Sequence, residues 1–73
     1  MEIHERIKGL REDHDQKQET IAKLLRITRQ QYSLYETGQR QFKLEHIQAL
    51  CIYYKVTADY ILGLPRGLDW PRR

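Results

Sequence analysis

The side chains that usually carry out enzymatic or metal chemistry do not stand at spacings that would let them act together. The three histidines are scattered along the chain, at His4, His14 and His46. Cys51 is the sole cysteine, so the chain can form neither an internal disulfide nor a cysteine-based zinc site. Glu12, Asp13 and His14 are consecutive, and on a helix their side chains splay apart. We therefore predict that the protein is no enzyme and holds no cofactor or metal.

Positive charge, in contrast, is concentrated in the middle of the chain. Residues 1–15 carry three Lys or Arg against five Asp or Glu, a balance of −2. Residues 16–43 carry six against two, or +4, and residues 44–73 carry four against three, or +1, which together give the net charge of +3. A local excess of this kind is expected where one segment faces a polyanion such as nucleic acid.

Length and composition fit one small domain. The chain has 73 residues, of which 40% are hydrophobic and 32% are charged, as in ordinary globular proteins. So short a chain buries only about 60% of the surface that its unfolded state exposes, which favours association with a partner subunit. No apolar run approaches the roughly 20 residues of a membrane span, and the acidic N-terminus does not resemble a signal peptide. We expect a cytoplasmic protein without membrane contact.

Apolar residues recur at helical spacing in short segments, and no alternating, strand-like run is present. We predict an all-α chain of five helices, at about residues 2–14, 18–25, between Thr28 and Gly38, 44–55 and 58–62. The second and third helices are joined by only about three residues, so they must cross steeply, as in a helix-turn-helix. At that crossing the small side chain of Ala22 lets the helices approach. The last ten residues, which include two prolines, are predicted to be irregular.

The start of the third helix carries a capping-box pattern, because Thr28 is followed three residues later by Gln31. Behind this cap, Tyr32 and Tyr35 are spaced by three and share one face, which we predict to be core. The remaining side chains of the helix then point elsewhere, and they are Arg29, Gln30, Ser33 and Leu34.

Four stretches in this order resemble the lambdoid-repressor or XRE family of helix-turn-helix DNA-binding proteins. They are residues 6–12, residues 18–22, residues 28–30 with 35–38, and residues 56–63. The resemblance implies a five-helix, lambda-repressor-like DNA-binding domain over residues 1–63, followed by a tail over residues 64–73. The sequence departs from the family at Arg26, where glycine is usual, and at residues 15–17, which lack the usual apolar residue and hydroxyl cap. Phe42 replaces a proline that often precedes the fourth helix.

The resemblance also implies roles for individual residues in binding double-stranded DNA. The third helix would read bases in the major groove, through Thr28, Arg29, Gln30, Ser33 and Leu34. Phosphates would be held by Lys17, Gln18, Arg40, Gln41 and Lys43. Arg11 and Glu36 would form a structural ion pair. Alternatively, Arg29 and Gln30 form only a solvated polar face, and Leu34 serves a protein partner.

The family resemblance further implies a homodimer on a palindromic operator. Its contacts would come from an apolar C-terminal strip consisting of Tyr60, Ile61, Leu64, Leu68 and Trp70. The alternative is that Leu64, Leu68 and Trp70 fold back on their own domain. We expect a transcriptional repressor from a bacterium or prophage, associated with the nucleoid when bound to DNA. Two other functions remain open: an antitoxin that represses its own operon, with the strip binding the toxin, and a protein-interaction module that has lost DNA binding.

Overall fold

The computed structural model of the protein describes residues 2–63, which form five α-helices and, within that range, no strand. The helices are α1 (Ile3–Asp13), α2 (Gln18–Leu25), α3 (Arg29–Glu36), α4 (Leu44–Tyr54) and α5 (Ala58–Leu62). The all-α prediction and the five helices are confirmed, and the predicted bounds differ from the observed ones by at most one residue at any end. None of the helices in the described part of the chain is long and apolar enough to span a membrane.

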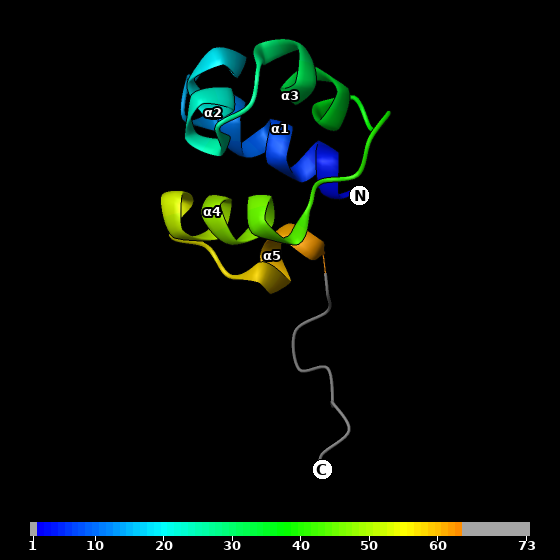
Figure 1. The fold of residues 1–73 in the computed structure, drawn as a ribbon. Helices are drawn as coiled ribbons and strands as arrows, with labels where there is room; N and C mark the ends of the chain where they lie inside the picture. Colours follow the sequence, from blue (N-terminus) through cyan, green and yellow to red (C-terminus); the bar gives the residue numbers. More distant parts are fainter. Residues whose placement is uncertain (1, 64–73) are drawn as a thin grey trace.

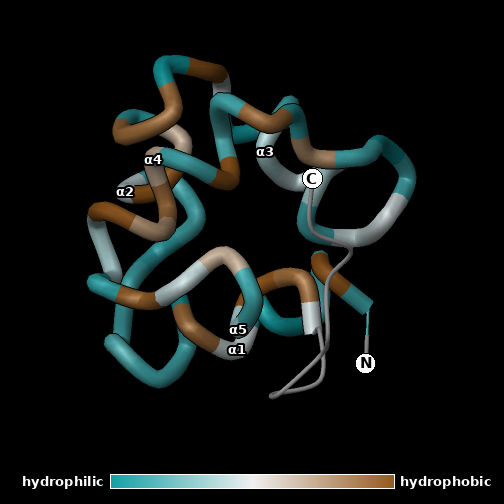
Figure 2. Tube along the Cα trace, turned by 90° about the horizontal axis from the view of Figure 1, so that it is seen from below, coloured by the Kyte–Doolittle hydropathy of each residue, from teal (hydrophilic) through white to brown (hydrophobic). Residues whose placement is uncertain are grey.

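The helices α1, α2 and α3 form an upper group, and α4 and α5 pack beneath it (Figure 1). Seen from below, apolar and polar stretches alternate along the trace, as expected for short helices that each bury one face (Figure 2). One cluster of buried side chains joins all five helices. It consists of Ile7, Leu10, Ile21, Ala22, Leu25, Tyr32, Ile47, Leu50, Tyr54 and Ile61.

The ends of three helices are set by residues in the left-handed backbone conformation. Gly63 ends α5 with φ 72°, whereas Arg26 ends α2 with φ 59° and Lys55 ends α4 with φ 57°. Because the family usually has glycine at this position, the resemblance implies a left-handed or otherwise costly conformation for Arg26, and this is confirmed. For a residue other than glycine this conformation costs on the order of 1 kcal/mol. After α3, Gly38 has φ 83°, a conformation that favours glycine.

The connection from α1 to α2 is held by polar contacts in place of an apolar anchor. Lys17 precedes α2 and gives no side-chain cap. The side chain of Gln16, however, donates to the Tyr53 hydroxyl at 2.6 Å and accepts from the Tyr54 hydroxyl at 2.7 Å. The backbone oxygen of Gln16 also accepts a hydrogen bond of 2.7 Å from Arg11. These contacts tie the connection to α4 and to α1.

Phe42 holds the connection from α3 to α4 against the domain. Its ring stacks on Tyr35, with centroids 5.2 Å apart, and lies edge-on to His46 at 6.2 Å. The backbone N–H of Lys43 donates to Nδ1 of His46 at 3.2 Å, which caps the first turn of α4. An aromatic cluster therefore anchors this connection where the family often has a proline.

Two expectations about apolar side chains are wrong. Ile61 is fully buried in the core, so its side chain cannot form the dimer contact expected of it. Leu44, whose helical spacing from Ile47 and Leu50 predicts an inward position, is 74% exposed, whereas Ile47, three positions later, is only 6% exposed. Cys51 is only half-buried, and burial raises the pKa of its thiol. The other expected dimer residues, Leu64, Leu68 and Trp70, lie outside the described residues.

Candidate nucleic-acid interface

The α2–α3 unit has the tight crossing that its sequence predicts. Ala22 is buried at this crossing, with 2% of its surface exposed. Its backbone oxygen accepts a hydrogen bond of 3.0 Å from the N–H of Ile27, which closes the turn after α2. Arg26, in the left-handed conformation, reverses the chain at this point. These features fix the direction in which α3 leaves the turn.

The first turn of α3 is fixed by the predicted capping box. The N–H of Gln31 donates to the Thr28 hydroxyl at 3.1 Å, and the N–H of Thr28 donates to Oε1 of Gln31 at 2.9 Å. The side chain of Gln31 is therefore engaged in the cap. Arg29 and Gln30, between the two, have exposed side chains that are not part of it.

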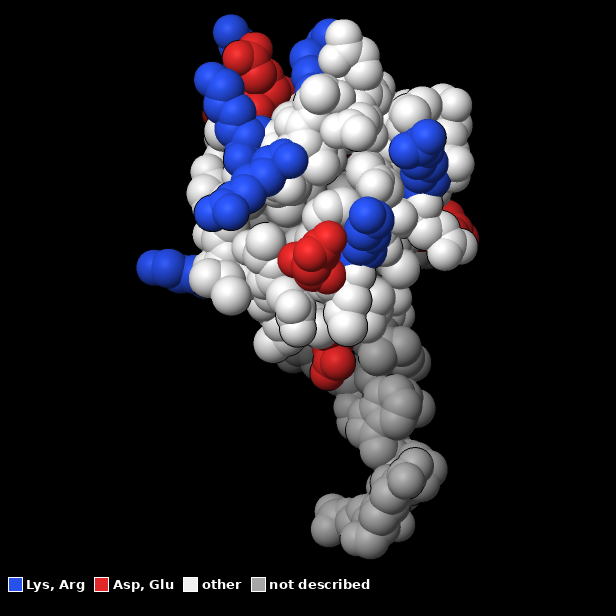
Figure 3. All heavy atoms as spheres, viewed as in Figure 1, with Lys and Arg blue, Asp and Glu red and all other residues white. Residues whose placement is uncertain are grey.

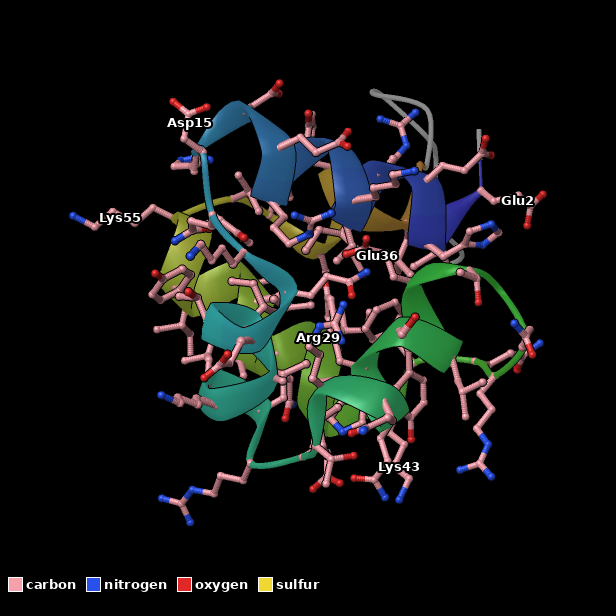
Figure 4. The ribbon with its side chains drawn as sticks, turned by 90° about the horizontal axis from the view of Figure 1, so that it is seen from above. Glu2, Asp15, Arg29, Glu36, Lys43 and Lys55 are labelled. Carbon is pink, nitrogen blue, oxygen red and sulfur yellow. The ribbon has the colours of Figure 1, made fainter. Side chains whose placement is uncertain are left out.

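The two faces of α3 differ in their exposure to solvent. Tyr32 and Tyr35 are buried, which confirms them as core residues. Thr28, Arg29 and Gln30 are exposed, and Ser33 and Leu34 are half-buried. The structure thus brings all five residues that were assigned to base reading onto the start and the outer side of one helix. Figure 4 shows Arg29 near the start of α3, with Lys43 of the α3–α4 connection on the same side of the domain.

A buried ion pair lies behind this surface. Arg11 of α1 donates to the Glu36 carboxylate through Nε at 2.8 Å and through Nη2 at 2.9 Å. The two side chains are only 13% and 3% exposed. Figure 4 shows Glu36 lying between α1 and α3. The ion pair that the family resemblance implies is thus present, and it locks the end of α3 onto α1.

Gln18, at the first position of α2, also forms a hydrogen bond with the Glu36 carboxylate. Its side-chain amide donates to Oε1 of Glu36 at 3.1 Å. Burial opposes the ionisation of Glu36, but the hydrogen bonds that it accepts, chiefly from Arg11, outweigh this effect and hold its pKa below the usual value of 4.5. Glu36 is therefore a carboxylate at neutral pH and links three helices. Gln18 sits at the start of α2 with one amide hydrogen already engaged.

Tyr32 lies next to this carboxylate. Burial, together with the negative charge of Glu36, raises the pKa of the tyrosine above its usual value. Its hydroxyl is fully enclosed, so Tyr32 supports α3 from within and cannot reach a ligand on the surface.

A protein-family sequence model described as helix-turn-helix matches residues 7–61. The chain belongs to this family. Its members are DNA-binding transcriptional regulators. No curated protein matches the chain.

Among solved structures, the helix-turn-helix chain is similar to a crystal structure of a transcriptional regulator from Listeria innocua, with a TM-score of 0.83 and 22% sequence identity. The similarity covers 93% of this chain and 64% of that one, so the chain spans less than two thirds of that regulator's length. At this level of identity the similarity establishes the fold.

The charges of the helix-turn-helix segment are arranged so that its cations face outward. Of the two acidic residues within residues 16–43, Glu36 is buried against Arg11 and Glu19 lies 3.4 Å from Lys23. Of the six Lys and Arg residues in this segment, Lys23 alone forms an ion pair within residues 2–63, and the other five are exposed. They are Lys17, Arg26, Arg29, Arg40 and Lys43. In Figure 3 most Lys and Arg side chains stand on the upper part of the molecule, around α2 and α3.

A second exposed surface lies on α4 and α5 and is apolar. A groove there is lined by Leu44, Ile47, Cys51, Ile52, Ala58 and Leu62, together with the polar Gln48. Ile52 is 79% exposed and Leu62 39% exposed. The expected dimer residue Tyr60 is 48% exposed, with the Arg6 guanidinium 5.6 Å from its ring centroid. Leu44 and Ile52 were not foreseen as surface residues. They are eight positions apart, about 80° around the helix axis, and both line this groove.

Proposed function

We propose that the protein binds double-stranded DNA at a specific sequence by placing α3 in the major groove. The observation that supports this best is the exposed pair Arg29 and Gln30 at a rigidly capped helix start. Arginine pairs with O6 and N7 of guanine, and glutamine pairs with N6 and N7 of adenine. Ser33 adds a hydroxyl, while Leu34 and the methyl group of Thr28 suit contact with a thymine methyl group.

Phosphate contacts flank this helix on two sides in the proposed complex. Lys17 and Gln18 stand at the start of α2, where free backbone N–H groups also favour anions. Arg40, Gln41 and Lys43 are exposed in the connection that follows α3. Such contacts set the position and orientation of the protein on the duplex but carry no sequence information themselves.

The protein acts in this proposal as a homodimer that represses transcription by occupying a palindromic operator. One recognition helix covers about half an operator, and two-fold dimers bind half-sites about 34 Å apart. The apolar groove of α4 and α5 supports association, because a chain this polar gains little from exposing Leu44, Ile52 and Leu62 as a monomer.

We expect Ile52→Glu to weaken self-association without disturbing the fold. The side chain is 79% exposed, so the charge enters no core, but in a dimer through this groove it would be buried without a partner. Sedimentation equilibrium should show a monomer at concentrations where the wild type is dimeric, with the thermal midpoint unchanged. Dimerisation equal to that of the wild type would mean that this face is not the interface.

The proposed function is tested by selecting bound duplexes from a random DNA pool. We expect a palindromic sequence to be enriched, and its affinity to fall steeply with salt because bound counterions are released from the phosphates. A pool that never enriches, combined with weak binding to every duplex, would contradict base reading by α3.

An antitoxin that represses its own operon is the second candidate, and the same apolar groove favours it, since a toxin chain would bury Leu44 and Ile52 as effectively as a second copy. Purification together with the product of a neighbouring gene, and release of DNA when that product is removed, would distinguish it from an independent repressor.

A further inference from the structure

Arg26 combines an unfavourable backbone with a side chain that the fold does not use. Its φ of 59° and ψ of 42° lie in the left-handed region, where glycine is the favoured residue. The side chain is exposed and, within residues 2–63, forms no ion pair or hydrogen bond. Within residues 2–63, no interaction of the Arg26 side chain therefore offsets the strain of its backbone.

The surroundings of Arg26 indicate what its side chain is for. A cleft of about 420 Å³ runs from the α2–α3 turn to the start of α4. Its rim carries three cations, Arg26, Arg40 and Lys43, against one carboxylate, that of Glu45. The cleft also borders Gln31, so it adjoins the helix start that presents Arg29 and Gln30.

We propose that this cleft is a binding site for the phosphodiester backbone of DNA and that Arg26 is one of its ligands. The proposal rests on the binding of duplex DNA proposed above and adds a phosphate contact at the turn before α3. A guanidinium suits this role, because it stays charged and can donate two hydrogen bonds to one phosphate. The turn would thus be anchored to the strand while α3 reads the bases.

The chain offers a matched control for the backbone effect. Lys55 is also an exposed cation in the left-handed conformation at a helix end, with φ 57° and ψ 44°. It lies at the far end of α4 and projects from the edge of the domain, away from Arg29 and Lys43 (Figure 4). Replacing either residue with glycine relieves the same backbone strain and removes one positive charge.

The test compares Arg26→Gly, Arg26→Lys and Lys55→Gly on the selected operator and on an unrelated duplex. Both glycine variants should raise the thermal midpoint, by roughly 4 °C. Arg26→Gly alone should weaken binding to both duplexes, on the order of tenfold, and reduce the slope of log affinity against log salt by about 0.9. Arg26→Lys, which keeps the charge and the strain, should keep the slope of the wild type.

The outcomes separate this site from the proposed function. If Arg26→Gly is more stable and binds the operator with the affinity and salt slope of the wild type, the phosphate site is wrong while operator binding stands. The same holds if Lys55→Gly weakens binding as much as Arg26→Gly, because the effect is then one of overall charge. If the wild-type protein binds no duplex, the site and the proposed function fail together.

Discussion

Arg29→Ala should abolish most of the discrimination at one base pair of each operator half-site. A bidentate arginine–guanine pair contributes about 1–3 kcal/mol of discrimination against the wrong base, or roughly 5- to 150-fold in relative affinity. Gln30→Ala should have a similar effect at a neighbouring pair. The capping box engages Thr28 and Gln31 and neither of these two side chains, so both variants should keep the helix and its stability.

Competition between the selected operator and single-base variants measures this effect. The expected result is a loss of preference at one position for each variant, with the remaining positions unaffected. Lys17→Ala provides the contrast, because loss of a phosphate contact weakens binding to all sequences about equally and reduces the salt slope. If Arg29→Ala behaved like Lys17→Ala, Arg29 would be a phosphate ligand and base reading would have to be assigned to other residues.

The sequence predicts the helix-turn-helix because its determinants are local. The Thr28–Gln31 cap, the small Ala22 and the spacing of Tyr32 and Tyr35 each act within a few residues. The left-handed backbone of Arg26 is instead implied by the family resemblance, because glycine usually stands at this position of the turn. Local determinants also explain why the bounds of the five helices agree so closely with the expected ones.

Contacts between segments that are distant in the sequence cannot be predicted from local patterns. The Gln16 side chain bridges the hydroxyls of Tyr53 and Tyr54, which are 37 and 38 positions away, and no pattern near residue 16 indicates them. The family resemblance implies that Ile61 is a dimer contact, but contacts with the other helices bury its side chain in the core. A periodic pattern identifies a face of a helix, but which face is covered depends on where the neighbouring helices end.

Arg11→Met should be the most destabilising change outside the apolar core. It leaves the Glu36 carboxylate, with a side chain 3% exposed, without its cation. Breaking a buried pair from one side costs about 3–5 kcal/mol, whereas an exposed pair contributes at most about 1 kcal/mol. For a domain of this size the larger value is a substantial part of the total free energy of unfolding. The double variant Arg11→Met with Glu36→Gln should recover part of the loss, because no buried charge then remains.

The stability of the wild type and that of Arg11→Met should depend differently on pH. In the wild type the pKa of folded Glu36 lies below its usual 4.5, so the stabilisation is present above that value and is lost as the pH falls through the folded pKa. Without Arg11, burial is expected to raise the folded pKa above 4.5, so acidification from pH 7 relieves the penalty. Other groups, including His46, whose pKa burial lowers, contribute equally to both proteins. Urea unfolding between pH 4 and 7 should therefore show the difference in stability between the wild type and Arg11→Met shrinking as the pH falls. A constant difference would mean that Glu36 does not change its ionisation with its partner, and that the ion pair holds α3 to α1 by packing alone.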